Sequence, residues 1–394
     1  MWGPGVKALV FERNVARYAA ARVAGAVVAG RGAAWGPLRL RDADVPDLPT
    51  PGWERLRPRL AGICGSDLAT IDSRSSRYFE PIVSFPFVPG HEVVGDRDDG
   101  TRAVLEAVLG CVARGIDPPC DACATGDVGR CERVAFGDLE PGLQTGFCCD
   151  TGGGWSTLLV AHPGQLHPVA DTLSDEAAVM VEPTACAVRA ALAAGDGGVQ
   201  VVLGAGTLGL LTIAALRRFG SPGTLIATAR YPHQARLAKD LGADIVVDPD
   251  EAHRAVRRAT GAMVIGDTLT RGADAVVDCV GSADTIATGI DIARAGGRVV
   301  LCGMPGNVTL DLTPLWHKEV ALVGAYAYGQ EAGGRRTFDL AFELVEAADL
   351  GRLVSAGYPL DRYREALEHA ANAGSRGSVK IAFDLRNERE RESL

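Results

Sequence analysis

A short stretch in the first quarter of the chain concentrates side chains that could bind a metal. Cys64 supplies a thiol, and after a polar segment an imidazole and a carboxylate follow side by side at His91 and Glu92. Thiolate, neutral imidazole and carboxylate are ligands that zinc takes, and catalytic zinc keeps one position open for water or substrate. A hydroxyl and a carboxylate accompany the thiol at Ser66 and Asp67. The pattern predicts a catalytic zinc site, and the alternative is a buried free cysteine with an unrelated loop histidine.

Four further cysteines form a second candidate metal site. They are Cys111, Cys120, Cys123 and Cys131. The last three have the spacing C-x2-C-x7-C. Four thiolates on one compact loop make a closed tetrahedral zinc site, whose binding energy contributes to folding. We therefore predict a structural zinc here, and disulfide pairing is the alternative.

An apolar helical pattern begins after Ser174, which has the chemistry of a helix N-cap. This pattern contains Glu182, directly before Pro183. A carboxylate in an apolar helix is costly unless it is paired or lies near a metal. Glu182 is therefore a candidate for the zinc site, and the alternative is a glutamate at a helix end with no role in function.

The segment VQVVLGAGTLGLLTIAALRRFG contains the glycine pattern of a dinucleotide-binding turn. A β-branched strand leads into Gly204, Gly206 and Gly209, with Leu208 before the last glycine, and an Ala/Leu-rich helix follows. In this motif the glycines permit a tight turn, and the helix N-terminus holds the pyrophosphate. Further strand–helix units follow in TLIATA, ADIVVD, DAVVDCVG and GRVVLCG. We predict a Rossmann domain with a doubly wound parallel sheet.

The end of the next strand bears on the choice of cofactor. An NAD site has Asp or Glu about 20 residues beyond the glycines, where it bonds the ribose 2′-hydroxyl. This chain reads Ala-Thr-Ala-Arg-Tyr there, so the acid is missing and Arg230 is present. A guanidinium suits a 2′-phosphate, and Arg236 could assist. We predict NADP in preference to NAD, and the alternative is that Arg230 is a solvated surface charge.

Length and composition describe the rest of the chain. At 394 residues, two domains are expected. A net charge of -9 without a clustered basic helix argues against nucleic acid, and no apolar run reaches the length of a membrane span. The ten cysteines cluster near a dinucleotide motif, which favours metal binding in a reducing compartment such as the cytoplasm. Short strands and Gly/Pro turns indicate a β-rich domain before residue 172.

These motifs together resemble the zinc-dependent medium-chain dehydrogenases, which include alcohol, sorbitol, threonine and sugar dehydrogenases. The resemblance rests on the motifs GICGSDL, PGHEVVG, GAGTLG, LAKDLGAD and KEVALVG and on the cysteine lobe. It implies a GroES-like catalytic domain split around a Rossmann domain. The expected boundaries are 1–172 and 326–394 for the catalytic domain and 173–325 for the Rossmann domain.

The resemblance also implies a role for each site residue. Cys64, His91 and Glu92 bind the catalytic zinc or lie next to it, and Glu182 is a direct ligand or holds the zinc-bound water. Asp67 resembles the acid that orients the zinc-binding histidine, and Ser66 resembles the hydroxyl that passes on the substrate proton. We keep Cys111 as the fourth ligand of the lobe because Asp117 occupies the usual position of the cysteine, although Cys111 precedes Cys120 by nine residues.

The expected function is a reversible hydride transfer between NAD(P) and a secondary alcohol or ketone, with two zinc ions per chain. A polyol, sugar or amino-alcohol substrate is favoured by the resemblance alone. The alternatives are a zinc-independent enone or quinone reductase on the same fold, or a non-catalytic NADPH-binding protein. The family also implies a homodimer or homotetramer. An N-terminal insertion around residues 14–34 is expected to be helical and has no obvious counterpart in the family.

Overall fold

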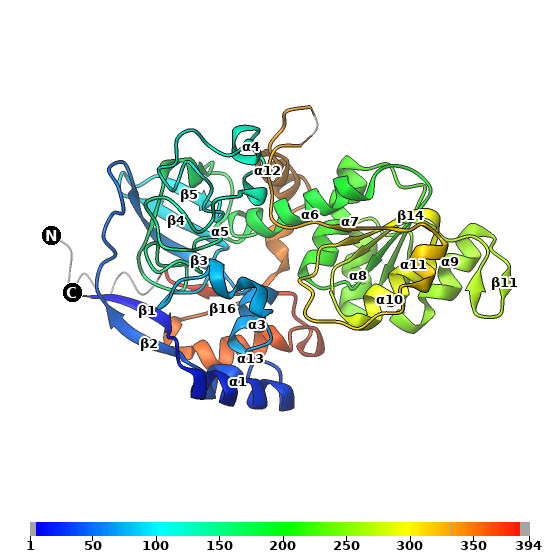
Figure 1. Ribbon diagram of the computed structural model, residues 1–394, viewed down its shortest axis with the longest axis horizontal. Helices are drawn as coiled ribbons and strands as arrows, with labels where there is room; N and C mark the ends of the chain where they lie inside the picture. Colours follow the sequence, from blue (N-terminus) through cyan, green and yellow to red (C-terminus); the bar gives the residue numbers. More distant parts are fainter. Residues whose placement is uncertain (1–4, 332, 387–394) are drawn as a thin grey trace. The chain divides into compact units, whose positions relative to one another are not determined.

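Two large β-sheets organise the part of the chain that the computed structural model describes, residues 5–331 and 333–386 (Figure 1). The chain divides into two compact units. The first comprises Met1–Glu182, Gly329–Phe338 and Asp349–Leu394, and the second comprises Pro183–Tyr328 and Asp339–Ala348. The domain boundaries expected from the sequence stay predictions.

The first unit is built on a predominantly antiparallel sheet, whose strands run in the order β16-β17-β3-β4-β5-β7 with β6 beside β3. Its strands are β3 (Glu54–Gly62), β4 (Val93–Arg97), β5 (Arg102–Leu105), β6 (Leu159–Ala161), β7 (Leu166–Pro168), β16 (Val354–Tyr358) and β17 (Lys380–Asp384). Strand β17 comes from the end of the chain and pairs with β3, so that Ala382 lies opposite Gly62. The rings of Trp155 and Phe383 meet edge to face in the buried core beneath this pairing. The β-rich domain predicted from the sequence is confirmed.

The pairing of β3 with β4 explains why residues far apart in sequence meet. The two strands are antiparallel, with Ala61 opposite Val93. The residues that follow β3 therefore lie beside the residues that precede β4, and the Gly62 amide donates to the Glu92 carbonyl oxygen at 2.8 Å. This register brings Cys64, just after β3, next to His91 and Glu92, just before β4.

The N-terminal insertion is helical, as predicted. It consists of α1 (Val15–Val27) and α2 (Gly32–Trp35) between the antiparallel strands β1 (Val6–Phe11) and β2 (Leu38–Ala43). Asp72, at the end of α3 (Gly65–Ile71), is fully buried and accepts hydrogen bonds from the amides of Gly30 and Gly32 at 2.9 and 3.0 Å. The insertion is thus fastened to the helix that follows Cys64.

The second unit is the predicted Rossmann domain. Its strands are β8 (Val199–Leu203), β9 (Thr224–Thr228), β10 (Ile245–Val247), β13 (Ala273–Asp278), β14 (Ala293–Leu301) and β15 (Ala321–Gly324). They are parallel throughout and run in the order β10-β9-β8-β13-β14-β15, which is the doubly wound order 3-2-1-4-5-6. Apolar runs such as Val201 and Val202 in β8, or Val299 and Val300 in β14, are fully buried, as expected for a sheet covered on both faces.

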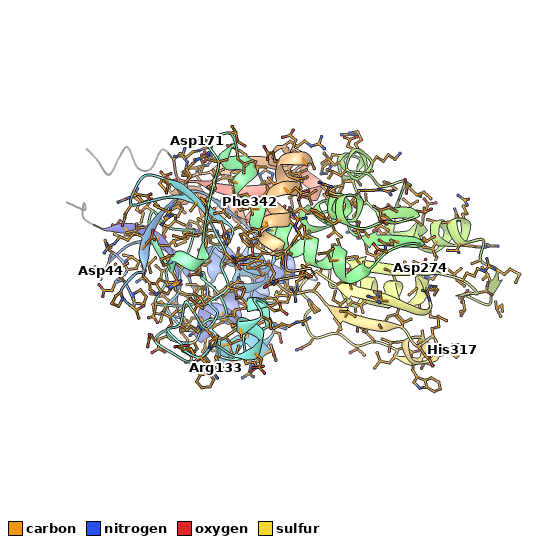
Figure 2. All side chains as sticks on the ribbon, turned by 90° about the horizontal axis from the view of Figure 1, so that it is seen from above. Asp44, Arg133, Asp171, Asp274, His317 and Phe342 are labelled. Atoms are coloured by element: carbon orange, nitrogen blue, oxygen red, sulfur yellow. The ribbon has the colours of Figure 1, made fainter. Side chains whose placement is uncertain are left out.

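The remaining elements of the described residues are helices, one short hairpin and several 3-10 turns. Figure 2 shows the side chains on the ribbon. The helices of the second unit include α7 (Thr207–Phe219), α8 (Pro232–Asp240), α9 (Ala252–Thr260), α10 (Ala283–Ile292) and α11 (Thr313–His317). Others are α4 (Asp121–Ala124), α5 (Asp175–Ala178), α6 (Val181–Ala194), α12 (Thr337–Ala347) and α13 (Tyr363–Ala371). A hairpin is formed by β11 (Val264–Ile265) and β12 (Thr268–Leu269). The 3-10 turns are Arg77–Ile82, Val128–Arg130, Pro163–Gln165, Pro249–Glu251, Leu350–Leu353, Leu360–Arg362 and Gly374–Arg376. Within the described ranges, no helix combines the length and apolar character needed to cross a membrane.

A buried carboxylate fixes the start of the helical segment that leads to Glu182. Ser174 caps α5, as predicted, by accepting from the Ala177 amide. Asp175 contacts the guanidinium groups of Arg59 at 2.8 Å and Arg102 at 3.0 Å. Burial alone would raise the pKa of Asp175, but the hydrogen bonds and charges of these two arginines hold it below its usual value.

Replacement of this carboxylate should destabilise the first unit. Because the pKa of Asp175 is lower in the folded chain, its contribution to stability is present above its unfolded pKa of about 3.9 and is lost as the pH falls through the folded value. We expect Asp175→Asn to lower the free energy of unfolding by about 1.5–3 kcal/mol at pH 7. Urea denaturation from pH 7 to pH 3 should show this difference shrinking in acid. The control is Asp98→Asn, since Asp98 forms an exposed pair with Arg57; equal losses in the two variants would contradict the prediction.

Candidate functional site

Cys64, His91 and Glu92 form one cluster in the first unit. Each offers a metal-ligand atom, and these atoms all lie within 4.8 Å of one another. The absence of a side chain at Gly62 makes room for this arrangement, because a Cβ there would lie 2.0 Å from Glu92 Oε2. The structure thus brings together three of the four residues predicted for the catalytic metal.

Asp67 joins the cysteine loop to the histidine. It lies in the first turn of α3, where its Oδ2 accepts from the Cys64 amide at 3.0 Å. Its Oδ1 is 3.4 Å from His91 Nδ1, and neither atom makes a hydrogen bond of normal geometry to the described residues. With Nδ1 directed at a carboxylate, Nε2 is the histidine nitrogen available to a metal. The role predicted for Asp67 in orienting His91 stays a prediction.

The cluster buries several acidic groups. Asp67 and Glu92 are each 1% exposed and Glu182 is 5% exposed. Burial disfavours the charged imidazolium, yet Asp67 and Cys64 hold the pKa of His91 well above its usual range. Burial raises the pKa of Glu182 to about 7, opposed by the positive charges of His91 and Lys380. Thiol, imidazole and buried carboxylates are a donor set that fits Zn²⁺, and a dication would offset the negative charge.

Glu182 and Ser66 are not members of the group formed by Cys64, His91 and Glu92. Glu182, in the first turn of α6, lies outside the group of ligand atoms within 4.8 Å, although its charge interacts with those of His91, Glu92 and Lys380. Ser66 is half-buried in the first turn of α3, next to Asp67. Their roles in holding water and moving a proton stay predictions.

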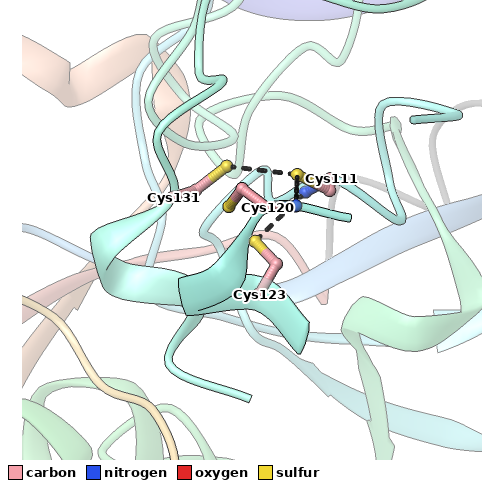
Figure 3. A group of neighbouring side chains, drawn as sticks. All are labelled: Cys111, Cys120, Cys123 and Cys131. Carbon is pink, nitrogen blue, oxygen red and sulfur yellow. Dashed lines mark hydrogen bonds between the residues drawn. The ribbon is translucent and has the colours of Figure 1, made fainter. Parts of the chain in front are cut away.

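The predicted structural site is a second cluster. Cys111, Cys120, Cys123 and Cys131 offer sulfur atoms within 4.8 Å of one another, and Figure 3 shows the sulfurs pointing toward a common centre. The Sγ atoms of Cys111 and Cys131 are 3.7 Å apart. The Cys120 amide lies 3.3 Å from Cys111 Sγ, and the Cys111 amide lies 3.5 Å from Cys123 Sγ. All ten cysteines are free thiols, so the structure contains none of the disulfides considered as the alternative. Cys111, rather than Asp117, joins the cluster.

An arginine that the sequence did not single out supports this lobe. Arg114 lies among the eight residues between Cys111 and Cys120 and is fully buried. Its guanidinium donates to main-chain carbonyl oxygens of the loop, including Leu109 at 3.1 Å and Phe136 at 3.0 Å. Burial lowers the pKa of Arg114. Arg114, in the inserted segment between the first two cysteines of the lobe, thus connects the backbone before this segment with the backbone after the last cysteine.

The phosphate-binding turn lies in the second unit, between β8 and α7. Gly204 has a φ of +88°, and a Cβ there would meet Val280 Cγ2 at 2.5 Å. A Cβ at Gly209 would lie 1.7 Å from the Gly204 carbonyl oxygen, so this glycine permits close packing of helix and strand. Gly206 has no atom within 4 Å of such a Cβ among the described residues, which leaves its backbone open to a ligand. Leu208, in the first turn of α7, is half-buried.

The segment that directly follows β9, residues 229–239, contains no carboxylate. The strand ends at Thr228, whose hydroxyl accepts from the Gly204 amide at 2.9 Å, and Ala229 follows. Arg230 and Arg236 are both exposed. The position at which an acid would bond a ribose hydroxyl is thus followed by an accessible guanidinium.

Fold and site together define a dehydrogenase with a metal site on a GroES-like domain and a dinucleotide-binding Rossmann domain. The alcohol dehydrogenase GroES-like domain matches residues 50–171, and the zinc-binding dehydrogenase model matches residues 207–347. Together these matches span more than half of the chain, which belongs to the zinc-dependent medium-chain dehydrogenase family.

Individual relatives agree with this assignment. The chain is 29% identical to an L-idonate 5-dehydrogenase of Vitis vinifera over 84% of this chain and 87% of that protein. It is 28% identical to a sorbitol dehydrogenase of Arabidopsis thaliana, over 84% of this chain and 88% of that protein. A galactitol-1-phosphate dehydrogenase structure from Escherichia coli has the same fold, with a TM-score of 0.70 and 18% identity. The match covers 96% of this chain and 99% of that one.

Membership of the family establishes the general chemistry. The protein is an oxidoreductase that uses zinc and a nicotinamide dinucleotide and acts on a small-molecule substrate. A structure from Sinorhizobium meliloti 1021, assigned as a zinc-binding dehydrogenase and bound to NADP, shares the fold with a TM-score of 0.70, 22% identity and coverage of 96% and 99%.

Two glycine substitutions should separate cofactor binding from folding. Gly206→Ala places a methyl group in open space where the pyrophosphate would approach, so the melting temperature should stay unchanged. Affinity for NAD(P) should fall about tenfold, equivalent to about 1.4 kcal/mol. Gly209→Ala meets the Gly204 carbonyl and should lower both quantities. Calorimetric titration and thermal melts measure the two effects, and unchanged cofactor affinity in Gly206→Ala would show that the turn does not hold the pyrophosphate.

Proposed function

We propose that the protein catalyses reversible hydride transfer between NAD(P) and a secondary alcohol of the polyol or sugar class. The observation that carries the proposal is the buried cluster of Cys64, His91 and Glu92. Two relatives of similar length are an L-idonate 5-dehydrogenase and a sorbitol dehydrogenase, which act on polyhydroxylated substrates. An amino-alcohol, the other class implied by the family motifs, is a variant of the same reaction.

In this mechanism Cys64, His91 and Glu92 would hold the catalytic zinc. When bound there, zinc supplies Lewis acidity that lowers the pKa of the substrate hydroxyl. Asp67 keeps the imidazole of His91 in orientation through Nδ1. Ser66, beside Asp67 in the first turn of α3, would carry the substrate proton away. A nicotinamide dinucleotide held at the glycine turn of Gly204, Gly206 and Gly209 would supply the acceptor for the hydride of the substrate.

Glu92 and Glu182 are alternatives for the third protein ligand. The clustering of Glu92 with Cys64 and His91 favours Glu92 as the ligand. Glu182, buried and electrostatically coupled to the same residues, would then hold the water that occupies the remaining position. A zinc-independent enone reductase or a non-catalytic NADPH-binding protein would have no use for such a donor set.

We further propose a second zinc in the lobe of four cysteines. The convergence of four sulfurs supports a closed tetrahedral site with no position for substrate. Such an ion stabilises the loop, while Arg114 satisfies its carbonyl oxygens from within. Two zinc ions per chain would result.

Metal analysis of single variants tests both zinc sites. Wild type should contain two zinc ions per chain, and both Cys64→Ala and Cys111→Ser should contain one. Cys64→Ala should lose turnover by about a thousandfold or more while keeping its melting temperature. Cys111→Ser should melt at a lower temperature. Cys149→Ser, outside both clusters, is the control and should retain both ions. Two zinc ions in Cys64→Ala, or full turnover without the thiol, would refute the proposed catalytic site.

We propose NADP as the preferred cofactor. Arg230 follows β9 directly and is exposed, and no carboxylate precedes it at the end of that strand. A 2′-phosphate there would gain a charge-assisted hydrogen bond, whereas a 2′-hydroxyl would lack its usual acidic partner. Arg236, which follows within α8, is also exposed and adds positive charge to this segment.

Reversing the charge at this position should reverse the preference. We expect Arg230→Asp to weaken NADP binding about 10- to 100-fold and to leave NAD binding equal or stronger, because an acid at this point bonds the ribose hydroxyl. Dissociation constants for both cofactors give the ratio. Arg254→Asp, on α9 beside Glu251, is the control for a change of surface charge. A similar loss for NADP and NAD in Arg230→Asp would assign the residue to the solvated surface.

Two further features support proposals about assembly and location. Strand β15 ends the Rossmann sheet, and exposed apolar side chains accompany it at Leu322, Leu312 and Trp316. An apolar sheet edge of this kind favours pairing with a second copy, which supports a homodimer or a homotetramer. The free state of all ten cysteines fits a reducing compartment, so we propose the cytoplasm.

A further inference from the structure

A buried lysine contacts the candidate catalytic site from the far end of the chain. Lys380, the first residue of β17, is 2% exposed and forms an ion pair with Glu92 Oε2. Its Nζ also donates to the Ile63 carbonyl oxygen at 3.1 Å. The pairing of β17 with β3 places it there, because Ile381 accepts from the Ile63 amide across the two strands.

The surrounding backbone is shaped around this ion pair. A Cβ at Gly62 would lie 2.0 Å from Glu92 Oε2 and 2.9 Å from Lys380 Cε, so only glycine admits both partners. A buried ion pair of this kind contributes little net stability, because two charges must leave water to form it. A pair of apolar residues would serve a purely structural role at least as well. The position of the pair against a metal-ligand cluster therefore calls for a functional account.

The geometry points to competition for one carboxylate. Glu92 belongs to the group that offers ligand atoms to a metal, and the same carboxylate is held by the Lys380 ammonium. We propose that Lys380 is a positioning residue that sets how strongly Glu92 binds the catalytic zinc. By taking part of the negative charge of Glu92, it weakens this ligand and keeps a coordination position available for substrate. The inference rests on the proposed catalytic zinc site.

The test measures zinc affinity in a double-mutant cycle. A chelator competes for Zn²⁺ with wild type, Lys380→Met, Glu92→Gln and the double variant, and the labile ion is identified by its absence from Cys64→Ala. We expect Lys380→Met to bind this zinc about tenfold more tightly and to turn over more slowly, because Glu92 then occupies the metal fully. Lys380→Arg, which keeps the charge, should restore an affinity within about threefold of wild type.

The second background separates a local effect from a general one. If Lys380 acts through Glu92, Lys380→Met should change zinc affinity by less than about threefold when residue 92 is glutamine. An equal change in both backgrounds, or none in wild type, would overturn the proposal and leave a structural ion pair. Should Lys380→Met fail to fold, Lys380→Gln takes its place in the cycle, since it is uncharged and still donates to Ile63. Retention of the labile zinc in Cys64→Ala would instead refute the catalytic site itself, and with it the role of Lys380.

Discussion

The burial of negative charge at the meeting point of β3 and β4 is the constraint on which the first unit depends. Asp67, Glu92 and Glu182 are all withdrawn from water in one region of this unit. Desolvation of several carboxylates is costly unless positive charge accompanies them. Part of that charge comes from Lys380 on the last strand of the chain. The return of the C-terminal segment into the first unit is therefore an electrostatic requirement of the site as well as a matter of packing.

Local patterns in the sequence predicted the parts of the structure that depend on neighbouring residues. The glycine turn could be recognised because each glycine has a local reason: a positive φ at Gly204 and the contact of Gly209 with the preceding carbonyl. Cys64 and the His91-Glu92 pair were predicted to meet, and the antiparallel register of β3 and β4 gives the cause. The choice of Cys111 over Asp117 also agrees with the geometry of the four sulfurs.

Long-range contacts and contacts to the backbone could not be predicted in this way. The sequence around Lys380 predicts a short strand. Nothing in it indicates that the lysine pairs with Glu92, in the loop that precedes β4. Arg114 binds main-chain oxygens, which every residue carries, so its role has no sequence signature beyond a charged residue in an otherwise compact loop. A basic residue in a buried strand is the one signal that could have identified Lys380, because an unpaired charge is rarely buried.

The N-terminal insertion acts on the same site from another side. Asp72 caps the C-terminal end of α3, and its buried carboxylate accepts hydrogen bonds from the amides of Gly30 and Gly32. Ser66 and Asp67 lie in the first turn of the same helix. A helix held at its C-terminal end by the insertion and at its N-terminal end by the Asp67–Cys64 hydrogen bond has little freedom to shift. Since Cys64 and His91, two of the proposed zinc ligands, both contact Asp67, a rigid α3 would also hold these two side chains in place. The insertion, although it lies outside both matched family domains, thus supports the part of the molecule where the chemistry is proposed to occur.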